Sequence, residues 1–332
     1  MEKQELIRKF LSLGCMVDQD ALQAMVDNPS VADRALQMIT SGQKVQTITL
    51  QWLNHQPVTI IQTFNKINGS ITPDDVIRSV QKRYDSMRET LSKQMQNMLS
   101  INKISPKTRN FSLISMIKEN NGNSILVEDD TGEARLSLKK ELSDKSKFLV
   151  EDEVVGLECE QAEGIVVGNI VWPDIPLGRI VAKADSSCIF AANVPDGKPF
   201  DSEYVFSFGN PTNSKAFFIT NTPAVNTFPD PCMVRIGDVK ILFLSCTEYT
   251  KTWDVAPEVA CLNLLKKRSL DPRINLASAD MSLSDIPDLI VCPTSGEPAV
   301  LNYKGTTIIS TSYPVCWSAN LKTRETFKIS MA

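Results

Sequence analysis

The chain of 332 residues contains a single histidine, His55. Serine and cysteine hydrolases use a histidine as the base that activates the nucleophile, and many catalytic zinc sites use several histidines as ligands. One histidine supports such chemistry only if it lies in the active centre. His55 follows Trp52-Leu53-Asn54 and precedes Gln56-Pro57, between two segments with helical patterns. We expect it to be a surface or cap residue, and the sequence favours no histidine-dependent catalysis.

The eight cysteines show no C-x-x-C spacing. This pattern excludes a zinc ribbon and a thioredoxin-type redox motif. Buried free thiols are the expected state, and free thiols fit a reducing compartment. The first residues are charged and no long apolar segment follows them, so we expect no secretory signal and a cytoplasmic location.

Acidic side chains gather in two short segments, 128–130 and 151–153, and both resemble turns. Nucleotidyl transfer needs carboxylates that a rigid sheet holds around two magnesium ions, which two turns do not provide. We therefore expect 128–132 to be a solvated hairpin turn closed by Gly132. The chain also lacks a G-x-x-x-x-G-K-[ST] segment, so no P-loop is predicted. A third turn, 293–298, follows an apolar strand pattern and contains neither histidine nor cysteine.

The composition is that of an ordinary globular protein, with 42% apolar and 22% charged residues. The length predicts two or three domains. A net charge of −4 argues against a protein that coats nucleic acid by charge alone. The longest apolar runs have the length of a strand and not of a membrane span, so we expect no membrane contact.

Helical periodicity dominates the first third of the chain. Residues 1–45 carry apolar side chains at helical spacing and predict a small helical module. Residues 46–105 predict a polar linker and one amphipathic helix from Thr72 to Met98, with Pro73 at its first position.

The spacing of apolar residues then changes to two. Short alternating segments separated by Asn-, Asp- and Gly-rich turns predict a small Greek-key barrel of the oligonucleotide-binding type over residues 106–172. Residues 173–332 alternate strands with Pro- and Asn-rich loops around one clear helix, Glu258 to Lys267. This pattern predicts an α/β or α+β sandwich. The expected fold class is therefore a multidomain α+β protein.

Several stretches, taken in order, resemble the small subunit of the archaeal D-family DNA polymerase, a relative of the B-subunits of eukaryotic replicative polymerases. They lie along roughly residues 1–328, and their order and spacing carry the resemblance. The matching stretches are Asp75-Val76-Ile77-Arg78-Ser79-Val80-Gln81-Lys82-Arg83-Tyr84, Glu128-Asp129-Asp130-Thr131-Gly132, Glu151-Asp152-Glu153-Val154-Val155-Gly156, Pro173-Asp174-Ile175-Pro176-Leu177, Leu264-Leu265-Lys266-Lys267-Arg268-Ser269-Leu270-Asp271-Pro272, Pro287-Asp288-Leu289-Ile290 and Tyr303-Lys304-Gly305.

The resemblance implies a helical N-terminal domain, an oligonucleotide-binding barrel and a calcineurin-like phosphoesterase domain. Active phosphoesterases of this kind hold two metal ions with Asp, His and Asn residues on loops at strand ends. This chain departs from that pattern, since one loop is deleted and the others have lost their Asp and His residues. The degenerate positions implied by the resemblance are Asn193, Asp196, Asn210, Cys246, Ser295 and Glu297.

Among these positions only Asn210 survives as a plausible ligand. One amide cannot hold a dimetal centre that depends on carboxylates and imidazoles. A makeshift site from Asp196, Cys246, Cys292 and Glu297 is disfavoured. No catalytic residue, metal or cofactor is therefore expected, and the turn 293–298 is interpreted as a vacated metal loop.

The resemblance implies a non-catalytic accessory subunit that forms a heterodimer with the large catalytic subunit of an archaeal replicative polymerase. The phosphoesterase domain would then serve as a docking platform, and a sliding clamp would be reached through the complex. DNA contact through the barrel would use Arg135, Lys139, Lys140 and Trp172, which fit ordinary surface or rim positions equally well. Three alternatives stay open: a eukaryotic-type B-subunit, an active 3′–5′ exonuclease and a stand-alone single-strand-binding protein.

Overall fold

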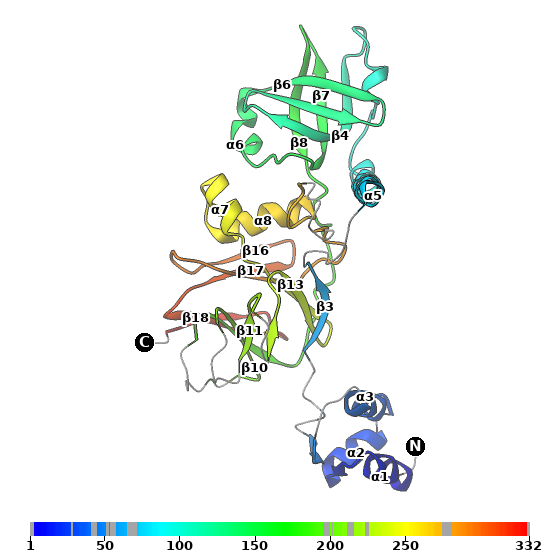
Figure 1. Ribbon diagram of the computed structural model, residues 1–332, viewed down its shortest axis with the longest axis vertical. Helices are drawn as coiled ribbons and strands as arrows, with labels where there is room; N and C mark the ends of the chain where they lie inside the picture. Colours follow the sequence, from blue (N-terminus) through cyan, green and yellow to red (C-terminus); the bar gives the residue numbers. More distant parts are fainter. Residues whose placement is uncertain are drawn as a thin grey trace.

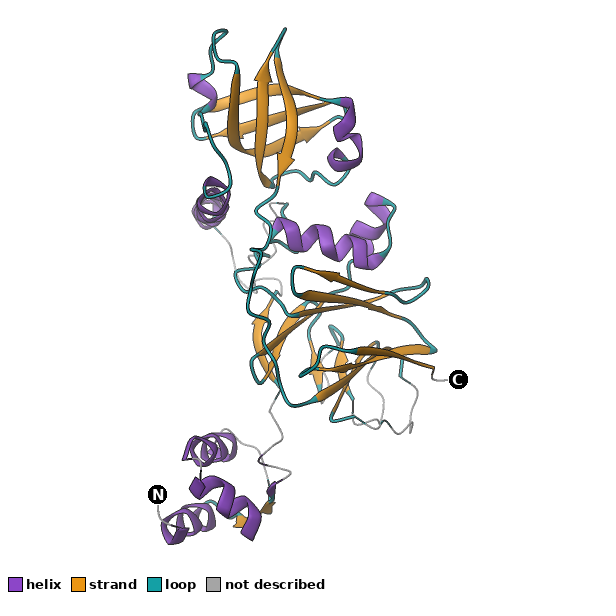
Figure 2. Cartoon of the chain, turned by 180° about the vertical axis from the view of Figure 1, so that it is seen from behind, coloured by secondary structure: helices purple, strands orange, loops and turns teal. Residues whose placement is uncertain are grey.

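A computed structural model describes residues 3–27, 29–40, 45–50, 53, 58–64, 72–194, 200, 202–210, 216–222, 226–273 and 281–330. The chain is a mixed α+β protein with three packed parts (Figures 1 and 2): a helical module, a closed barrel and a sandwich of two sheets. His55 and Asp196 lie outside the described residues.

The helical module contains α1 (Lys3–Ser12), α2 (Gln19–Asp27) and α3 (Pro29–Thr40), as the apolar periodicity predicts. Two short parallel strands, β1 (Met16–Val17) and β2 (Thr47–Ile48), close it. Ile48 and Leu53 belong to the same buried cluster as Leu6 and Phe10. The packed module thus continues beyond residue 45, because residues of the following segment complete its core.

Helix α5 (Pro73–Ser92) packs against the outside of the barrel. Thr72 caps it with a reciprocal pair of hydrogen bonds to Asp75, and Pro73 occupies the first turn. The prediction that this helix extends to Met98 was wrong, because α5 ends at Ser92. The chain leaves the helix after Ser92 and folds back, so that Met95 joins the buried cluster formed by Tyr84 and Leu91.

The barrel contains β4 (Asn110–Asn120), β5 (Ser124–Asp129), β6 (Gly132–Leu138), β7 (Val154–Gln161) and β8 (Ile165–Val171). Its strand order is β4-β5-β6-β8-β7, closed by pairing of β4 with β7. The η1 turn (Ile101–Lys103) precedes it, and η2 (Lys140–Leu142) with α6 (Ser143–Ser146) connects β6 to β7. Alternate residues such as Phe111 and Leu113 fill the interior, which explains the period of two.

The first sheet of the sandwich has the order β12-β11-β10-β9-β18-β19. Its strands are β9 (Ser187–Ala192), β10 (Tyr204–Phe208), β11 (Phe217–Ile219), β12 (Thr227–Phe228), β18 (Val315–Asn320) and β19 (Thr326–Ser330). Strands β9 to β12 run parallel, whereas β18 and β19 are antiparallel to their neighbours.

The second sheet has the order β16-β17-β15-β14-β13-β3. It contains β3 (Thr59–Thr63), β13 (Cys232–Ile236), β14 (Val239–Phe243), β15 (Leu289–Pro293), β16 (Val300–Tyr303) and β17 (Thr306–Thr311). Strand β3 lies in the segment that was predicted to be a polar linker. It is a half-exposed edge strand on β13, so its short sequence shows little apolar pattern.

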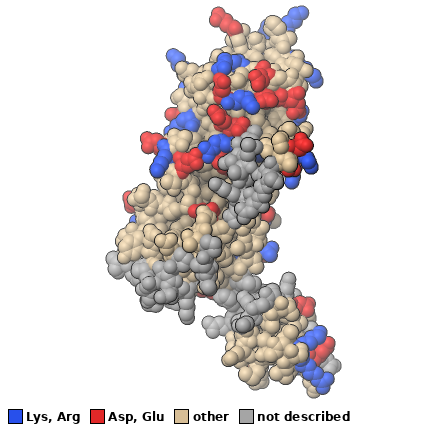
Figure 3. Space-filling view, viewed as in Figure 1, with Lys and Arg blue, Asp and Glu red and all other residues tan. Residues whose placement is uncertain are grey.

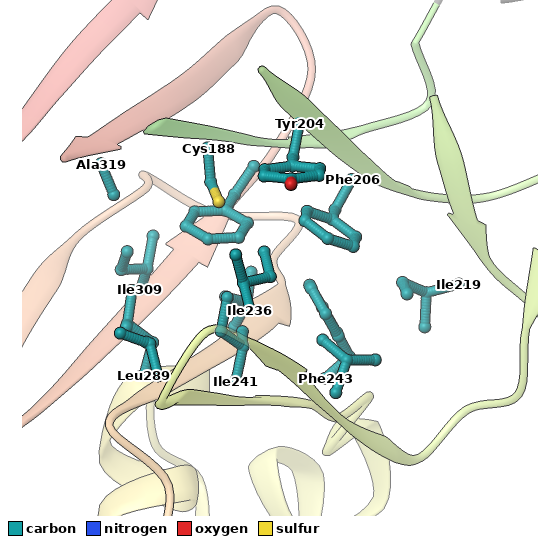
Figure 4. Close-up of a cluster of buried hydrophobic side chains, with 14 of the residues drawn as sticks. Cys188, Tyr204, Phe206, Ile219, Ile236, Ile241, Phe243, Leu289, Ile309 and Ala319 are labelled. Atoms are coloured by element: carbon teal, nitrogen blue, oxygen red, sulfur yellow. The ribbon is translucent and has the colours of Figure 1, made fainter. Parts of the chain in front are cut away.

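Aromatic and aliphatic side chains from both sheets meet between them (Figure 4), including Phe190, Phe206 and Phe243. The outer face of the second sheet carries α7 (Thr247–Trp253) and α8 (Pro257–Lys267), which form a second cluster with Leu242 and Ile290. Strands β14 and β15 are therefore buried on both faces and are almost entirely apolar, with the half-buried Lys240 as the exception in β14.

Candidate functional site

The carboxyl ends of the parallel strands meet at one edge of the sandwich. Phe208 ends β10 in the first sheet and Phe243 ends β14 in the second, and their ring centroids are 6.0 Å apart. The loops after β9, β10, β14 and β15 hence emerge on the same side. We call this side the loop edge, defined by residues 193, 209–210, 245–246 and 294–298. Binding residues gather at such an edge because the strand ends position them.

The structure brings the two asparagine loops together. Asn193 follows β9 in a left-handed conformation (φ 53°), and its backbone N–H donates to the carbonyl of Phe208 at 2.7 Å. A Cβ on Gly209 would lie 2.6 Å from Asn193 Oδ1, so the glycine lets the amide approach the backbone of the next loop. Asn210 follows and is exposed. Two amides thus occupy the ends of β9 and β10.

The positions on the second sheet do not converge with these amides. Ser295 and Glu297 are exposed, and the Glu297 carboxylate lies 3.6 Å from the ammonium of Lys328. Cys246 is buried, and its thiol donates to the carbonyl of Pro257 at 3.5 Å. The Cys246 side chain is therefore directed toward the start of α8, and not toward Ser295 and Glu297.

Sequence reasoning missed one carboxylate at the loop edge, Asp230. Its Oδ1 accepts a hydrogen bond from the backbone of Ser245 at 3.0 Å, and its own N–H donates to Asn221 Oδ1 at 3.1 Å. Burial raises the pKa of Asp230, and the hydrogen bond from Ser245 opposes this effect. The Phe-Pro-Asp-Pro segment that contains Asp230 has the composition of a turn, and nothing in it predicts a buried carboxylate. A single carboxylate with two amides lacks the charge to hold two metal ions.

A buried cluster of three thiols lies beside the loop edge: Cys246, Cys261 and Cys292. Their sulfur atoms all lie within 4.8 Å of one another. Within the described ranges no other group of three His, Cys, Asp or Glu side chains gathers in this way. Cys261 was missed, because nothing in the sequence shows that a residue of α8 faces the ends of β14 and β15. All eight cysteines are buried thiols outside any disulfide, as predicted from their spacing.

Hydrogen bonding within this cluster polarises the thiols. The Cys261 thiol donates to Cys246 Sγ at 3.6 Å. Hydrogen bonds from Cys261 and then Cys292 lower the pKa of Cys246 to about 4, against the effect of burial. The hydrogen bond with Cys246 in turn raises the pKa of Cys261 and of Cys292, and the carboxylate of Glu258 adds a smaller upward effect on Cys292. Cys246 is the sulfur that most readily carries negative charge.

Two of the basic barrel residues proposed for DNA contact form ion pairs with acidic side chains on the protein surface. Arg135 pairs with Glu119 and Lys139 with Glu160, each at 2.9 Å, while Lys140 is exposed at the start of η2. Basic and acidic side chains are interspersed over the barrel in Figure 3. A hollow of about 580 Å³ on its surface is lined by residues that include Glu158 and Glu160. These carboxylates oppose the approach of a phosphate backbone.

Trp172 also takes part in an internal contact. It is half-buried against the barrel core, and the ammonium of Lys267 lies 5.1 Å from its ring centroid. Lys267 ends α8 and forms an ion pair with Glu153, which directly precedes β7. Both side chains are almost completely buried, with 2% and 3% exposure. Burial raises the pKa of Glu153 and lowers that of Lys267, and their mutual attraction opposes both effects.

A second set of contacts holds the segment that leaves the barrel. Asp174 Oδ2 accepts hydrogen bonds from Tyr303 at 2.7 Å and Lys304 at 2.6 Å. Arg268 Nε donates to the backbone carbonyl of Asp174 at 2.7 Å. We call these contacts, together with the Glu153–Lys267 pair, the barrel–sandwich joint. Its residues come from four of the stretches that carry the family resemblance.

The chain was compared with families of known proteins and with curated proteins. No family model matches it, and no curated protein is similar to it. Among the described helices, none combines the length and the apolar character that crossing a membrane requires.

Proposed function

We propose that the chain is the non-catalytic small subunit of a replicative DNA polymerase similar to the archaeal D-family enzyme. The barrel is of the oligonucleotide-binding type, and the sandwich is a degenerate calcineurin-like phosphoesterase domain. The observation that carries the proposal is the chemistry of the loop edge. Loops at the strand ends carry Asn193, Asn210, Ser295 and Glu297, with the Cys246 thiol directed inward. These described residues stand at strand ends, where a dimetal phosphoesterase would carry its ligands, and they include one carboxylate and no imidazole.

The architecture supports the same assignment. A closed five-stranded barrel with the order β4-β5-β6-β8-β7 fits the oligonucleotide-binding type, and a two-sheet sandwich follows it in the chain. The stretches containing Glu153, Asp174, Lys267 and Tyr303 are distant in sequence and meet at the barrel–sandwich joint. Four of the seven stretches that carry the resemblance thus contribute residues to this contact.

The proposed role of the sandwich is to dock the large catalytic subunit. On the face shown in Figure 3, basic and acidic side chains are mixed over the barrel, which does not favour nucleic acid over a protein partner there. Direct contact of the barrel with DNA stays a prediction, since Arg135 and Lys139 are paired with carboxylates.

The test is affinity purification of the tagged full chain from the native lysate, with identification of large co-purifying proteins by mass spectrometry. We expect a D-family catalytic subunit in stoichiometric amount. A eukaryotic-type catalytic subunit would instead identify the chain as a B-subunit of that class. Recovery of the chain without any polymerase subunit would contradict the docking role and favour a stand-alone single-strand-binding protein.

A further inference from the structure

Three of the eight cysteines lie far apart in the sequence and meet in one place in the fold. Cys246 lies between β14 and α7, Cys261 lies in α8 and Cys292 lies in β15. Their exposures are 4%, 1% and 0%. The other five cysteines do not join a comparable group within the described part of the chain. The convergence is therefore a local feature of the α7–α8 layer and not a general result of cysteine burial.

The spacing of the sulfur atoms suits a metal ion. Metal–sulfur bonds of about 2.3 Å in a tetrahedral zinc site place two sulfurs roughly 3.8 Å apart. The Cys246 and Cys261 sulfurs are 3.6 Å apart, and all three pairs are within 4.8 Å. Small side-chain rotations would thus bring three thiolates to bonding distance of one zinc ion. Soft thiolate ligands favour zinc over magnesium or calcium.

A fourth ligand is available from the same helix. Glu258 lies three residues before Cys261 in α8, so the two side chains share one face of the helix. Glu258 Oε2 is buried and has no hydrogen-bond partner among the described residues. A carboxylate oxygen shielded from water is stabilised by a bound cation. The Glu258 carboxylate lies outside the group of ligand atoms that are within 4.8 Å of one another, so its side chain would rotate toward the thiols to bind the same ion.

We propose that Cys246, Cys261, Cys292 and Glu258 bind one zinc ion. Three thiolates and one carboxylate give the same site charge as four thiolates, which is a common structural zinc site. Binding would release the thiol protons to solvent, and the ion would tie α7 and α8 to the ends of β14 and β15. The ion would be structural, because all four zinc positions are filled by protein atoms and none remains for a substrate.

The first experiment measures metal in the full chain purified without chelators from zinc-supplemented medium. We expect about one zinc per chain by elemental analysis. Replacement by cobalt should give a thiolate-to-cobalt charge-transfer band and a tetrahedral d–d spectrum. Zinc below about a tenth of an equivalent, together with no cobalt band, would overturn the proposal. Peptide mapping that finds a Cys246–Cys261 disulfide in freshly purified protein would overturn it as well.

Variants assign the ligands. Cys261→Ser should lose the bound zinc, whereas Cys188→Ser, a buried cysteine in the core between the two sheets, should retain it. Glu258→Gln removes only a charge, and we expect zinc affinity to fall at least about tenfold while the circular dichroism spectrum is unchanged. Unchanged affinity in Glu258→Gln would remove Glu258 from the site. Unchanged zinc content in folded Cys261→Ser would contradict the site altogether.

Discussion

At the scale of single residues, the Glu153–Lys267 pair shows how burial changes the contribution of an ion pair to the free energy of unfolding. Neither side chain reaches solvent, and the ammonium also lies near the rings of Trp172 and Trp253. Removing two ions from water is expensive, and their attraction offsets the cost only while both are present. The pair is therefore sensitive to loss of either partner.

We expect Glu153→Gln to lower the free energy of unfolding by about 3–5 kcal/mol, because the Lys267 ammonium then stays buried without a counter-ion. Chemical denaturation measures the loss. The matched control is Glu119→Gln, which breaks an exposed pair with Arg135 and should cost less than about 1 kcal/mol. Replacing both buried partners, as in Glu153→Leu with Lys267→Met, should recover much of the stability. Equal effects of the buried and exposed substitutions would contradict this account.

Asp230 gives a prediction of pH dependence. Its folded-state pKa is raised above 3.8, so the folded protein holds the proton more tightly than the unfolded chain does. Ionisation of Asp230 therefore reduces stability as pH rises from about 3.8 through the folded pKa. Asp230→Asn removes this effect and keeps an oxygen for the Ser245 N–H. We expect the variant to be more stable than wild type at pH 7 and to lose that advantage below pH 3.8, as measured by urea unfolding. A larger advantage in acid would show the opposite sign of shift.

At the scale of elements, local chemistry explains where α5 begins better than where it ends. Thr72, Pro73 and Asp75 form a helix start that can be recognised without tertiary information. Its end at Ser92 has no glycine or proline signal in the sequence. The helix stops because Met95 turns back into the cluster of Tyr84 and Leu91, which is a tertiary contact.

We expect Thr72→Ala to lower the free energy of unfolding by about 1 kcal/mol, since the backbone N–H of Asp75 loses its acceptor. The measurement is chemical denaturation followed by circular dichroism. Thr90→Ala serves as the control, because that hydroxyl donates only to the Ser86 carbonyl within the helix. A loss in Thr72→Ala no larger than in the control would mean that packing on the barrel, and not the cap, fixes the helix start.

At the scale of the whole molecule, the barrel–sandwich joint and the loop edge have different roles. The joint fixes the barrel on the sandwich through buried charges, and the loop edge presents amides and exposed polar side chains at the ends of the strands. The core between the sheets consists of buried apolar side chains, so the fold of the sandwich does not depend on which residues occupy the loop edge.

We expect the purified chain with manganese to leave single-stranded DNA intact, because the described residues of the loop edge offer too few carboxylates and no imidazole for a dimetal site. The assay is product analysis by denaturing gel. Asn210→Ala should behave like the wild-type chain. Manganese-dependent cleavage that Asn210→Ala abolishes would refute the loss of the site and restore the exonuclease alternative.

The sequence by itself determined the local elements. The structure confirms the helices of the N-terminal module, the strands of the barrel, and strands within 189–192, 239–244, 289–291 and 306–310. Alternation and turn residues act over a few positions, so they can be recognised in the chain. Edge strand β3, the inward direction of Cys246 and the meeting of Cys261 with Cys292 were decided only by tertiary packing. Those contacts join residues far apart in the chain, so local spacing cannot predict them. Burial of the sheet faces selects which side chains face each other.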